Sequence, residues 1–310
     1  MNAAVPSEGR AAPPVRVLVT GLRGFTGRYM ADVLTRRGYV VHGTLASSES
    51  AAPRGAREHV ADLLDPQALL KVVEEVQPNH VLHLAAIAFV AHGNVDAIYR
   101  TNVVGTRNLL QAVATAGSTN LRSVILASSA NVYGNAVVNP IDEGVSPQPA
   151  NDYAVSKLAM EYVAALWREQ LPITIVRPFN YTGVGQSPQF LLPKVVDAFR
   201  RRAAELELGN IDVERDFSDV RDVVEAYAGL LDAPPGCVVN VCSGTSHSLS
   251  EILAFAREIT GHSPHIRINP AFVRANEVRR LQGSNARLRS LIGPWHARPV
   301  RETLEWMLLA

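Results

Sequence analysis

Two side chains capable of proton chemistry stand four residues apart in the segment N-D-Y-A-V-S-K, residues 151–157. Tyr153 and Lys157 open an amphipathic run that continues to Leu166, and residues at i and i+4 share one face of a helix. A neighbouring ammonium favours the phenolate and lowers the pKa of a tyrosine from about 10 toward neutral pH. Tyr153 is therefore predicted to donate or accept a proton at a carbonyl or alcohol.

The alternative to this interpretation is a surface tyrosine beside a solvated lysine. The chain has only three lysines and eight tyrosines, so about 0.08 such pairs are expected by chance.

A serine elsewhere in the chain supports the catalytic interpretation of Tyr153 and Lys157. The run Ser123–Ser128 predicts a buried strand, and Ser129 follows its carboxyl end, where open α/β sheets bind ligands. A hydroxyl there could share a substrate oxygen with Tyr153, although Ser128-Ser129 could also be a plain turn.

A glycine-rich turn near the amino terminus predicts a dinucleotide site. The apolar run Val15–Thr20 predicts a buried strand, Gly21-x-x-Gly24-x-x-Gly27 follows, and a helical pattern then extends to about Arg37. Strand, glycine turn and helix are the context that a dinucleotide fingerprint requires. The glycines let the backbone approach a pyrophosphate, which the free N–H groups of the helix amino terminus can bind. A plain tight turn is the alternative.

The residues after the second predicted strand, Tyr39–Leu45, bear on the choice of cofactor. A NAD-selective site usually places an acid at the end of this strand to hold the ribose hydroxyls. The segment Gly43–Ser48 reads G-T-L-A-S-S and has none. Arg23, Ser47 and Ser48 could instead hold a 2′-phosphate. The sequence therefore favours NADP(H), with NAD(H) as the alternative.

The next elements continue an alternating pattern. We expect a third strand at His59–Leu63, a helix at Pro66–Val76 and a fourth strand at His80–Ala85. Asp62-Leu63 could form an edge for the adenine, and the small Ala85-Ala86 could pass beneath the cofactor. His83 is predicted to be a core histidine, because no cluster of cysteine, histidine and acid accompanies it. No metal site is predicted.

The rest of the chain completes a parallel sheet and then loses its regularity. A long helix carrying Asn102 (Asp96–Ala116) and a sixth strand (Ile173–Arg177) predict a doubly wound Rossmann-type α/β fold. Beyond it we expect the helices Phe190–Arg202, Val220–Leu231, Leu249–Thr260, Glu277–Ile292 and Val300–Leu309 and the strand Cys237–Cys242. These predict a smaller C-terminal α/β substrate lobe. The expected units are a disordered leader (1–14), a dinucleotide-binding domain (15–180) and a lobe mainly in 181–310, with the chain free to cross back.

Bulk composition excludes several classes of function. Lys+Arg number 30 and Asp+Glu number 29, so the chain lacks the basic field that nucleic-acid binding needs. No apolar run is long enough to span a membrane. Two cysteines are too few for a disulfide framework, and Cys237 and Cys242 are predicted to be buried free thiols. The leader has no apolar signal core, so we expect a cytoplasmic protein.

Together these motifs resemble the extended short-chain dehydrogenase/reductase family, which acts on nucleotide-linked sugars. The resemblance runs from Val15 to the C-terminus and includes S-S-A-N-V-Y-G (128–134), R-P-F-N (177–180) and G-V-G-Q (183–186). In the C-terminal part, R-D-F-S-D-V-R-D (215–222), V-N-V-C-S-G (239–244) and G-S-N (283–285) resemble the GDP-mannose branch. Within that branch the likeness is to 4-keto reductases more than to 4,6-dehydratases. F-N-Y-T-G (179–183) replaces the more usual F-N-H-x-G.

The resemblance implies NAD(P)H-dependent reduction of the C4 ketone of GDP-4-dehydro-6-deoxy-D-mannose to GDP-D-rhamnose. It implies Ser129, Tyr153 and Lys157 as the catalytic residues. Cofactor contacts are expected, besides Tyr153 and Lys157, at Gly21, Arg23, Gly24, Phe25, Thr26, Gly27, Thr44, Asp62, Leu63, Leu84, Ala85, Ala86 and Pro178. Substrate contacts are expected at Asn180, Gln186, Lys194, Arg215, Arg274 and Glu277. Arg215 would bind phosphate, with a salt bridge to Asp216 or Asp219 as the alternative.

Different activities of the same scaffold stay open at this point. A dehydratase needs a further acid or base two residues after Ser129, where this chain has Asn131, so dehydration is disfavoured. A nucleotide-sugar 4-epimerase, a reductase giving the C4 epimer 6-deoxytalose, and a non-enzymatic cofactor-binding regulator all remain open. By resemblance, the helices at Asp96–Ala116 and Asn151–Gln170 predict a homodimer formed through a four-helix bundle.

Overall fold

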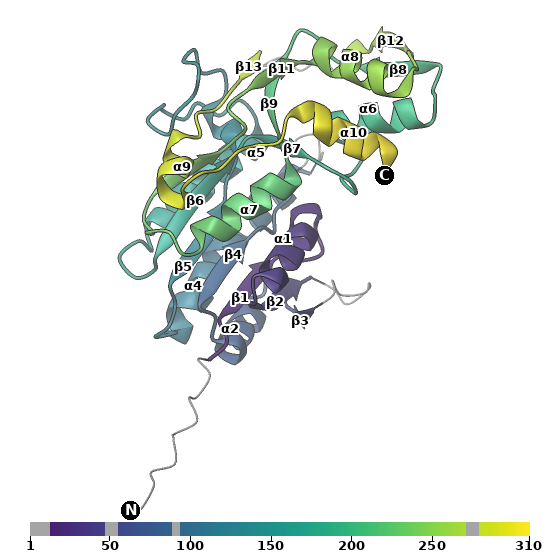
Figure 1. Cartoon of the computed structure of the whole chain (residues 1–310). Coiled ribbons are helices and arrows are strands. Elements are labelled where there is room, and N and C mark those ends of the chain that lie inside the picture. Colours follow the sequence, from purple (N-terminus) through teal and green to yellow (C-terminus); the bar gives the residue numbers. More distant parts are fainter. Residues whose placement is uncertain (1–12, 47–54, 89–93, 271–278) are drawn as a thin grey trace, which may run out of the picture.

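A seven-stranded parallel sheet forms the centre of the molecule (Figure 1). The computed structural model describes residues 13–46, 55–88, 94–270 and 279–310. The strands, in spatial order, are β10 (Val238–Val241), β6 (Ile173–Pro178), β5 (Ser123–Ala127), β4 (His80–His83), β1 (Arg16–Thr20), β2 (Val40–Leu45) and β3 (Ala56–Val60). The order reverses between β1 and β4, and doubly wound sheets bind ligands beside such a point, at the carboxyl ends of the strands.

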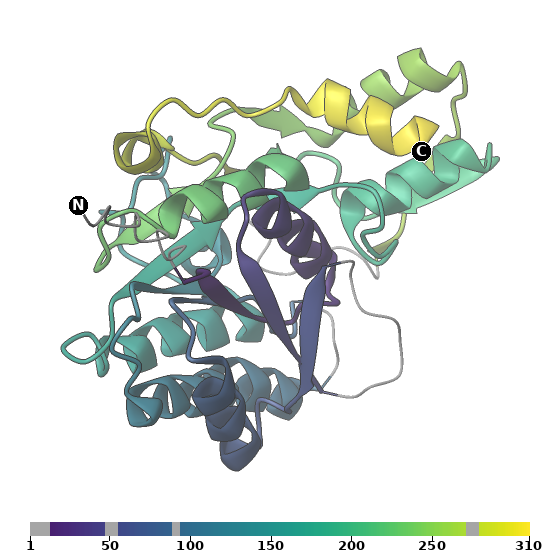
Figure 2. The same ribbon diagram turned by 60° about the horizontal axis from the view of Figure 1, so that its bottom comes forward.

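Helices cover both faces of this sheet, so most strand residues are buried. On one face α1 (Phe25–Arg36) packs against α7 (Val220–Leu230), and their apolar side chains share a core with Val17, Val19 and Val41. On the other face α2 (Pro66–Val76), α4 (Thr106–Ala116) and α5 (Asp152–Ala165) pack on Leu18 and Val81. The two layers are clear in Figure 2. The Rossmann-type fold predicted from the sequence is confirmed.

The helix that precedes α4 contains a π-helical turn. The short α3 (Val95–Tyr99) runs directly into a π-helix at Arg100–Gly105, and this continues into α4. The predicted helix Asp96–Ala116 is therefore present. Its middle turn is widened in the way that often marks a functional position in a helix. The buried Asn102 lies in this turn.

A second layer of structure lies beyond one end of the sheet. There β9 (Glu214–Asp219) pairs with β7 (Asn180–Thr182), β11 (Ser246–Ser248) and β13 (Arg280–Leu281). A separate two-stranded sheet joins β8 (Glu205–Leu208) to β12 (His265–Ile268). The helices α6 (Leu191–Arg200), α8 (Leu249–Thr260) and α10 (Val300–Leu309) enclose a core of their own. This lobe stands at the upper right of Figure 1.

The structure corrects several predicted elements. The third strand is Ala56–Val60 instead of His59–Leu63, and Glu277–Ile292 is not one helix, because β13 precedes a shorter α9 (Ala286–Ile292). The strand predicted at Cys237–Cys242 is β10, which pairs with β6 at the edge of the central sheet. The chain thus crosses back from the lobe. The short strands β7, β8, β11 and β12 had no sequence signal that we recognised, and residues 1–12 of the predicted leader lie outside the described residues.

Two further observations concern the length of the helices and the state of the cysteines, of which only Cys242 is buried as predicted. Among the described residues, no helix is long and apolar enough to cross a membrane. Both cysteines are free thiols, Cys242 buried and Cys237 only half-buried.

Candidate active site

The glycine turn forms a backbone cradle between β1 and α1. Gly21 has φ +72°, and a Cβ there would lie 2.9 Å from both the Cα and the N of Ala85, just beyond β4. A Cβ on Gly27 would lie 2.2 Å from the Gly21 carbonyl oxygen. Helix α1 begins at Phe25 with no side-chain cap, so its first N–H groups can serve an anion. The geometry of the turn fits a dinucleotide pyrophosphate, and the contacts of its residues with a cofactor stay predictions.

The three predicted catalytic residues meet at the carboxyl end of β5. Asn151 caps α5 by accepting a 2.9 Å hydrogen bond from the N–H of Ala154, which sets where the helix begins. Tyr153, in the first turn, lies close enough to Ser129 for the serine hydroxyl to interact with the phenol. Lys157, one turn later, donates a 2.8 Å hydrogen bond from Nζ to the carbonyl of Ala127. All three side chains are buried.

Burial dominates the ionisation of this group. It raises the pKa of Tyr153, and the hydrogen bond from Ser129 offsets only part of that rise. The expectation of a lowered Tyr153 pKa is therefore wrong for this structure, because burial outweighs the other influences on the phenol. Burial also lowers the pKa of Lys157 to about 8, while the carboxylate of Glu161 opposes that shift. Lys157 thus titrates close to neutral pH.

Side chains from neighbouring elements fix the backbone that follows β4. The buried Asn102 accepts a hydrogen bond from the N–H of Ile87 (2.9 Å) and donates to its carbonyl (3.2 Å). His83 lies between Thr20 Oγ1 (2.7 Å from Nδ1) and Thr106 Oγ1 (2.9 Å from Nε2). Burial lowers the pKa of His83 to about 3, so it is neutral. The prediction of a core histidine is confirmed.

The predicted cofactor residues lie along one edge of the sheet. The N–H groups of Leu84 and Ala85 donate hydrogen bonds to the carbonyl and the hydroxyl, respectively, of Thr20 at the end of β1. Arg23 makes a bidentate salt bridge to Glu58 of β3, at 2.9 Å from Nε and 2.6 Å from Nη2. Thr44, Leu63 and Pro178 are buried, Ala86 is half-buried, and Asp62 is exposed and accepts from the N–H of Leu64. Ser47 and Ser48 lie outside the described residues.

One tyrosine that was not predicted connects the lobe to the glycine turn. The hydroxyl of Tyr181 on β7 lies 2.8 Å from Thr26 Oγ1, and its ring stacks on Phe25 at 6.1 Å between centroids. Tyr181 lies close enough to Tyr153 to raise its pKa further. The departure of F-N-Y-T-G from the family pattern was the available signal. Tyr181 places its neighbour Asn180, a predicted substrate residue, at the same end of the sheet.

The other predicted substrate residues are more scattered. Gln186 is bonded within its own loop, to Thr182 Oγ1 and the Tyr181 carbonyl. Lys194 is half-buried on α6. Arg215 on β9 donates to the carbonyls of Glu214 and Arg279. The alternative considered for it, a salt bridge to Asp216 or Asp219, is absent from this part of the described structure, and its binding of phosphate stays a prediction. Arg274 and Glu277 lie outside the described residues.

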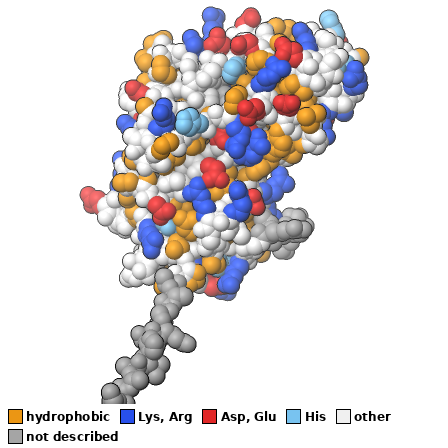
Figure 3. Space-filling view, viewed as in Figure 1, with side chains coloured by type: hydrophobic (Ala, Val, Ile, Leu, Met, Phe, Trp, Pro, Cys, Tyr) orange, Lys and Arg blue, Asp and Glu red, His pale blue; other side chains and the backbone are white. Residues whose placement is uncertain are grey.

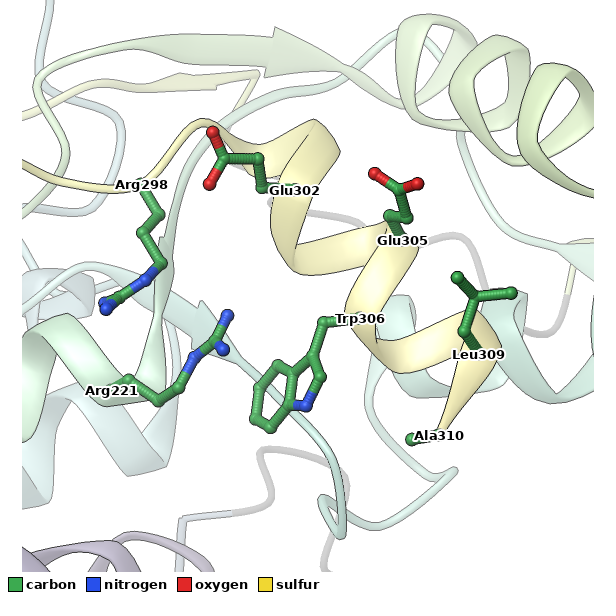
Figure 4. Close-up of a pocket in the computed structure, with 7 residues that line it drawn as sticks. All are labelled: Arg221, Arg298, Glu302, Glu305, Trp306, Leu309 and Ala310. Atoms are coloured by element: carbon green, nitrogen blue, oxygen red, sulfur yellow. The ribbon is translucent and has the colours of Figure 1, made fainter.

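Two other kinds of site could lie among the described residues: a metal site and a second hollow. No three histidine, cysteine or acidic side chains among the described residues gather to hold a metal. An open hollow of about 500 Å³ lies elsewhere, between α7 and α10 (Figure 4). There Arg221 stacks over Trp306, but Arg221 and Arg298 are paired with Asp219 and Asp222. The hollow contains none of the predicted catalytic residues.

Comparison with known proteins identifies the family. A family described as GDP-mannose 4,6 dehydratase matches residues 18–307. The GDP-6-deoxy-D-mannose reductase of Pseudomonas aeruginosa is 36% identical over 290 residues, 90% of this chain and 91% of the relative. The GDP-6-deoxy-D-talose 4-dehydrogenase of Aggregatibacter actinomycetemcomitans is 33% identical over 296 residues, 94% of this chain and 97% of the relative.

Solved structures agree with this relationship. The Pseudomonas aeruginosa protein RMD, complexed with NADPH, superposes with a TM-score of 0.82 at 33% identity, covering 95% of this chain and 98% of that one. A candidate epimerase of Burkholderia cenocepacia J2315 gives a TM-score of 0.89 at 49% identity, covering 96% and 99%. The solved structures thus agree with the fold described above, and the family match gives the family of the chain.

The close approach of Gly21 to Ala85 makes a testable prediction. Gly21→Ala should weaken dinucleotide binding at least tenfold, because the new Cβ pushes the turn away from β4. Gly38→Ala is a matched control, since Gly38 also has a positive φ (+82°) but no atom within 4 Å of the place where a Cβ would stand. Both variants should lose about 1 kcal/mol of stability to backbone strain. Equal cofactor affinity in the two variants, measured by fluorescence titration, would contradict the cradle.

Proposed function

We propose that this chain, which belongs to the GDP-mannose 4,6-dehydratase family, reduces the C4 ketone of GDP-4-dehydro-6-deoxy-D-mannose. The observation that carries the proposal is the meeting of Ser129, Tyr153 and Lys157 beside the glycine turn. A phenol and a hydroxyl that lie side by side can both reach one carbonyl oxygen. The relatives named as a reductase and a dehydrogenase of GDP-6-deoxy sugars support this substrate class.

The residues of this chain supply the proton and the position. When bound, the nicotinamide supplies the hydride that adds to C4. Tyr153 donates its phenolic proton to O4, and Ser129 donates a hydrogen bond to the same oxygen as charge develops there. Lys157, one helical turn away, stabilises the phenolate that remains until solvent returns a proton. Its reach to the nicotinamide ribose stays a prediction.

Asn131 argues against dehydration. It stands two residues after Ser129, in the first turn of the short helix Ala130–Tyr133, and its N–H donates a 3.1 Å hydrogen bond to Ser129 Oγ. A carboxamide cannot exchange the proton that elimination of water across C5 and C6 requires. The position thus supports a reductase that uses a keto sugar made by another enzyme.

The product and the direction of hydride transfer define the competing candidates. We propose GDP-D-rhamnose, the product expected of a GDP-6-deoxy-D-mannose reductase. The relative named as a GDP-6-deoxy-D-talose 4-dehydrogenase favours the C4 epimer as a second candidate. The Burkholderia structure favours a 4-epimerase as a third. An epimerase would retain its NAD and return the hydride, so it would consume no added reduced cofactor.

The cofactor proposal rests on Arg23. We propose NADP(H), with Arg23 as the partner of a 2′-phosphate, and NAD(H) as the alternative. Glu58 supplies from β3 the acid that the end of β2 lacks. Because this carboxylate neutralises Arg23 and repels a phosphate, it should reduce the preference for NADP(H). The NADPH-bound structure of RMD supports a site of this kind.

We also propose a homodimer and a cytoplasmic location. Helices α3 to α5 and the π-helix between them expose apolar side chains, including Val104, Val155, Tyr162 and Leu166. The last two have relative exposures of 68% and 78%, and such side chains on adjacent helices are typical of an interface between subunits. Figure 3 shows the opposite face, where charged side chains are interspersed with apolar ones. Light scattering should report twice the 33.5 kDa chain mass.

Removal of one hydroxyl tests the proposed reaction. Tyr153→Phe should lower kcat for loss of NADPH absorbance with GDP-4-dehydro-6-deoxy-D-mannose by about 10²- to 10⁴-fold, because O4 loses its proton donor. Tyr39→Phe, directly before β2 at the amino ends of the strands, should leave kcat unchanged. Reduction by Tyr153→Phe at the wild-type rate would show that another group supplies the proton. No consumption of NADPH or NADH by the wild type would favour the epimerase.

Removal of one charge tests the cofactor assignment. Glu58→Gln should strengthen NADPH binding about three- to tenfold, because the 2′-phosphate then no longer competes with the Glu58 carboxylate for Arg23. NADH lacks this phosphate, so its affinity should not change, and Glu74→Gln on the exposed side of α2 serves as a control. Calorimetric titration measures both dissociation constants. Equal changes for the two cofactors would place Glu58 away from the 2′ position.

A further inference from the structure

Three consecutive residues at the carboxyl end of β5 each interact with a polar side chain of α5, and the first two do so through hydrogen bonds. The pairs are Ala127 with Lys157, Ser128 with Glu161, and Ser129 with Tyr153. Tyr153, Lys157 and Glu161 are spaced at i, i+4 and i+8, so they share one face of the helix. Only the first two were recognised from the sequence. Glu161, the helix residue that pairs with Ser128, is a buried acid that was not singled out from the sequence.

Both carboxylate oxygens of Glu161 accept hydrogen bonds from side chains at the ends of β5 and β6. Its Oε1 accepts hydrogen bonds from Ser128 Oγ (2.5 Å) and Arg177 Nε (2.9 Å), and its Oε2 accepts from Arg177 Nη2 (2.6 Å). Glu161, Ser128 and Arg177 are all buried. Arg177 lies at the end of β6, three residues before the predicted substrate residue Asn180. One carboxylate therefore joins the ends of β5 and β6 to the helix that carries Tyr153.

The guanidinium that holds Glu161 is itself fixed. The Cζ of Arg177 lies 4.8 Å from the centroid of the Tyr133 ring, and the Tyr133 hydroxyl donates a 2.7 Å hydrogen bond to Asn240 of β10. A buried ion pair costs desolvation and is weak evidence for stability alone. Here Glu161 is hydrogen-bonded to Ser128, beside the predicted catalytic Ser129, and Arg177 packs on Tyr133. The geometry of this pair points to a role in the reaction.

We propose that Glu161 is a positioning residue of the reaction, which holds the end of β5 against α5 so that Ser129 stays beside Tyr153 and Lys157 stays on the carbonyl of Ala127. This inference rests on the proposed reductase function for its kinetic readout. Its structural readout, the titration of Lys157, needs no substrate. Glu161 touches neither substrate nor the reacting atoms, and it acts only through Ser128 and Lys157.

Of the groups that shift the pKa of Lys157, Glu161 is the one that favours the protonated ammonium. Burial favours the neutral amine, and the Glu161 carboxylate opposes this. From β4, His83 faces Lys157 but is neutral, because its pKa is about 3. On α5, Tyr153 is a neutral phenol, since burial raises its pKa. From β6, Arg177 reaches this region through Glu161. Without the carboxylate, the ammonium should therefore lose its proton at lower pH.

The first test follows the lysine directly. The chain has only Lys71, Lys157 and Lys194, so lysine labelled with ¹³C at Cε gives three NMR signals, which Lys71→Arg and Lys194→Arg assign. Glu161→Gln should lower the pH at which Lys157 titrates by about one unit. Glu169→Gln, the same change at an exposed position after α5, should leave it unchanged. An unchanged Lys157 titration in Glu161→Gln overturns the inference, whatever the activity of the wild type.

The second test divides the two effects of Glu161 kinetically. Glu161→Gln should lower kcat about ten- to a hundredfold with an unchanged KM for the nucleotide sugar, and move the alkaline limb of kcat to lower pH. Ser128→Ala removes one hydrogen bond and leaves the ion pair intact. It should lower kcat without moving that limb. A rise in KM with unchanged kcat in both variants would overturn the positioning role.

A further variant covers the case in which Glu161→Gln does not fold. That change leaves a buried Arg177 without the carboxylate it pairs with, which can destabilise the fold strongly. Glu161→Gln combined with Arg177→Met removes both charges and should fold. Arg177 is not among the groups that shift Lys157, so the titration should still move to lower pH. Wild-type titration in this double variant would show that the pair is structural only.

Discussion

The structure depends on the contact between α5 and the carboxyl end of β5. Parallel strands end at one edge of the sheet, and the groups just beyond them would be unpaired there without a partner. Helix α5 supplies that partner through Tyr153, Lys157 and Glu161. A hydroxyl, an ammonium and a phenol are thereby brought together in a buried place. The fold and the chemistry thus use the same hydrogen bonds.

Other elements bring a cofactor and a substrate to this contact. The glycine turn abuts Ala85 just beyond β4, where only a residue without a Cβ fits. Asn102 and His83 fix the adjoining backbone from the helix and the strand beside it. Tyr181 then connects the lobe to α1 through Thr26. Each of these contacts lies at the switch point of the sheet, and so the site is positioned mainly by the order of the strands.

The sequence predicted those parts of the molecule whose signals are local. Helices α2, α8 and α10 begin and end where their patterns predicted, and the glycine turn and the Tyr153–Lys157 spacing were legible as motifs. What failed depends on contacts between distant residues. The pairing of β10 with β6, the salt bridge of Arg23 to Glu58, and the bond of Lys157 to Ala127 each join segments 30 or more residues apart. The pKa of Tyr153 was wrong for the same reason, because burial is a property of the fold.

Isotope transfer tests the central claim most directly. The purified protein would be given GDP-4-dehydro-6-deoxy-D-mannose and NADPH with deuterium in the transferable position of the nicotinamide, and the product would be analysed by NMR. The account predicts one deuterium at C4 of the GDP-6-deoxy sugar for each NADPH oxidised. The proton couplings at C4 of the product made with unlabelled NADPH distinguish rhamnose from 6-deoxytalose. A sugar product without deuterium at C4, or deuterium retained in the cofactor, would contradict reduction at C4.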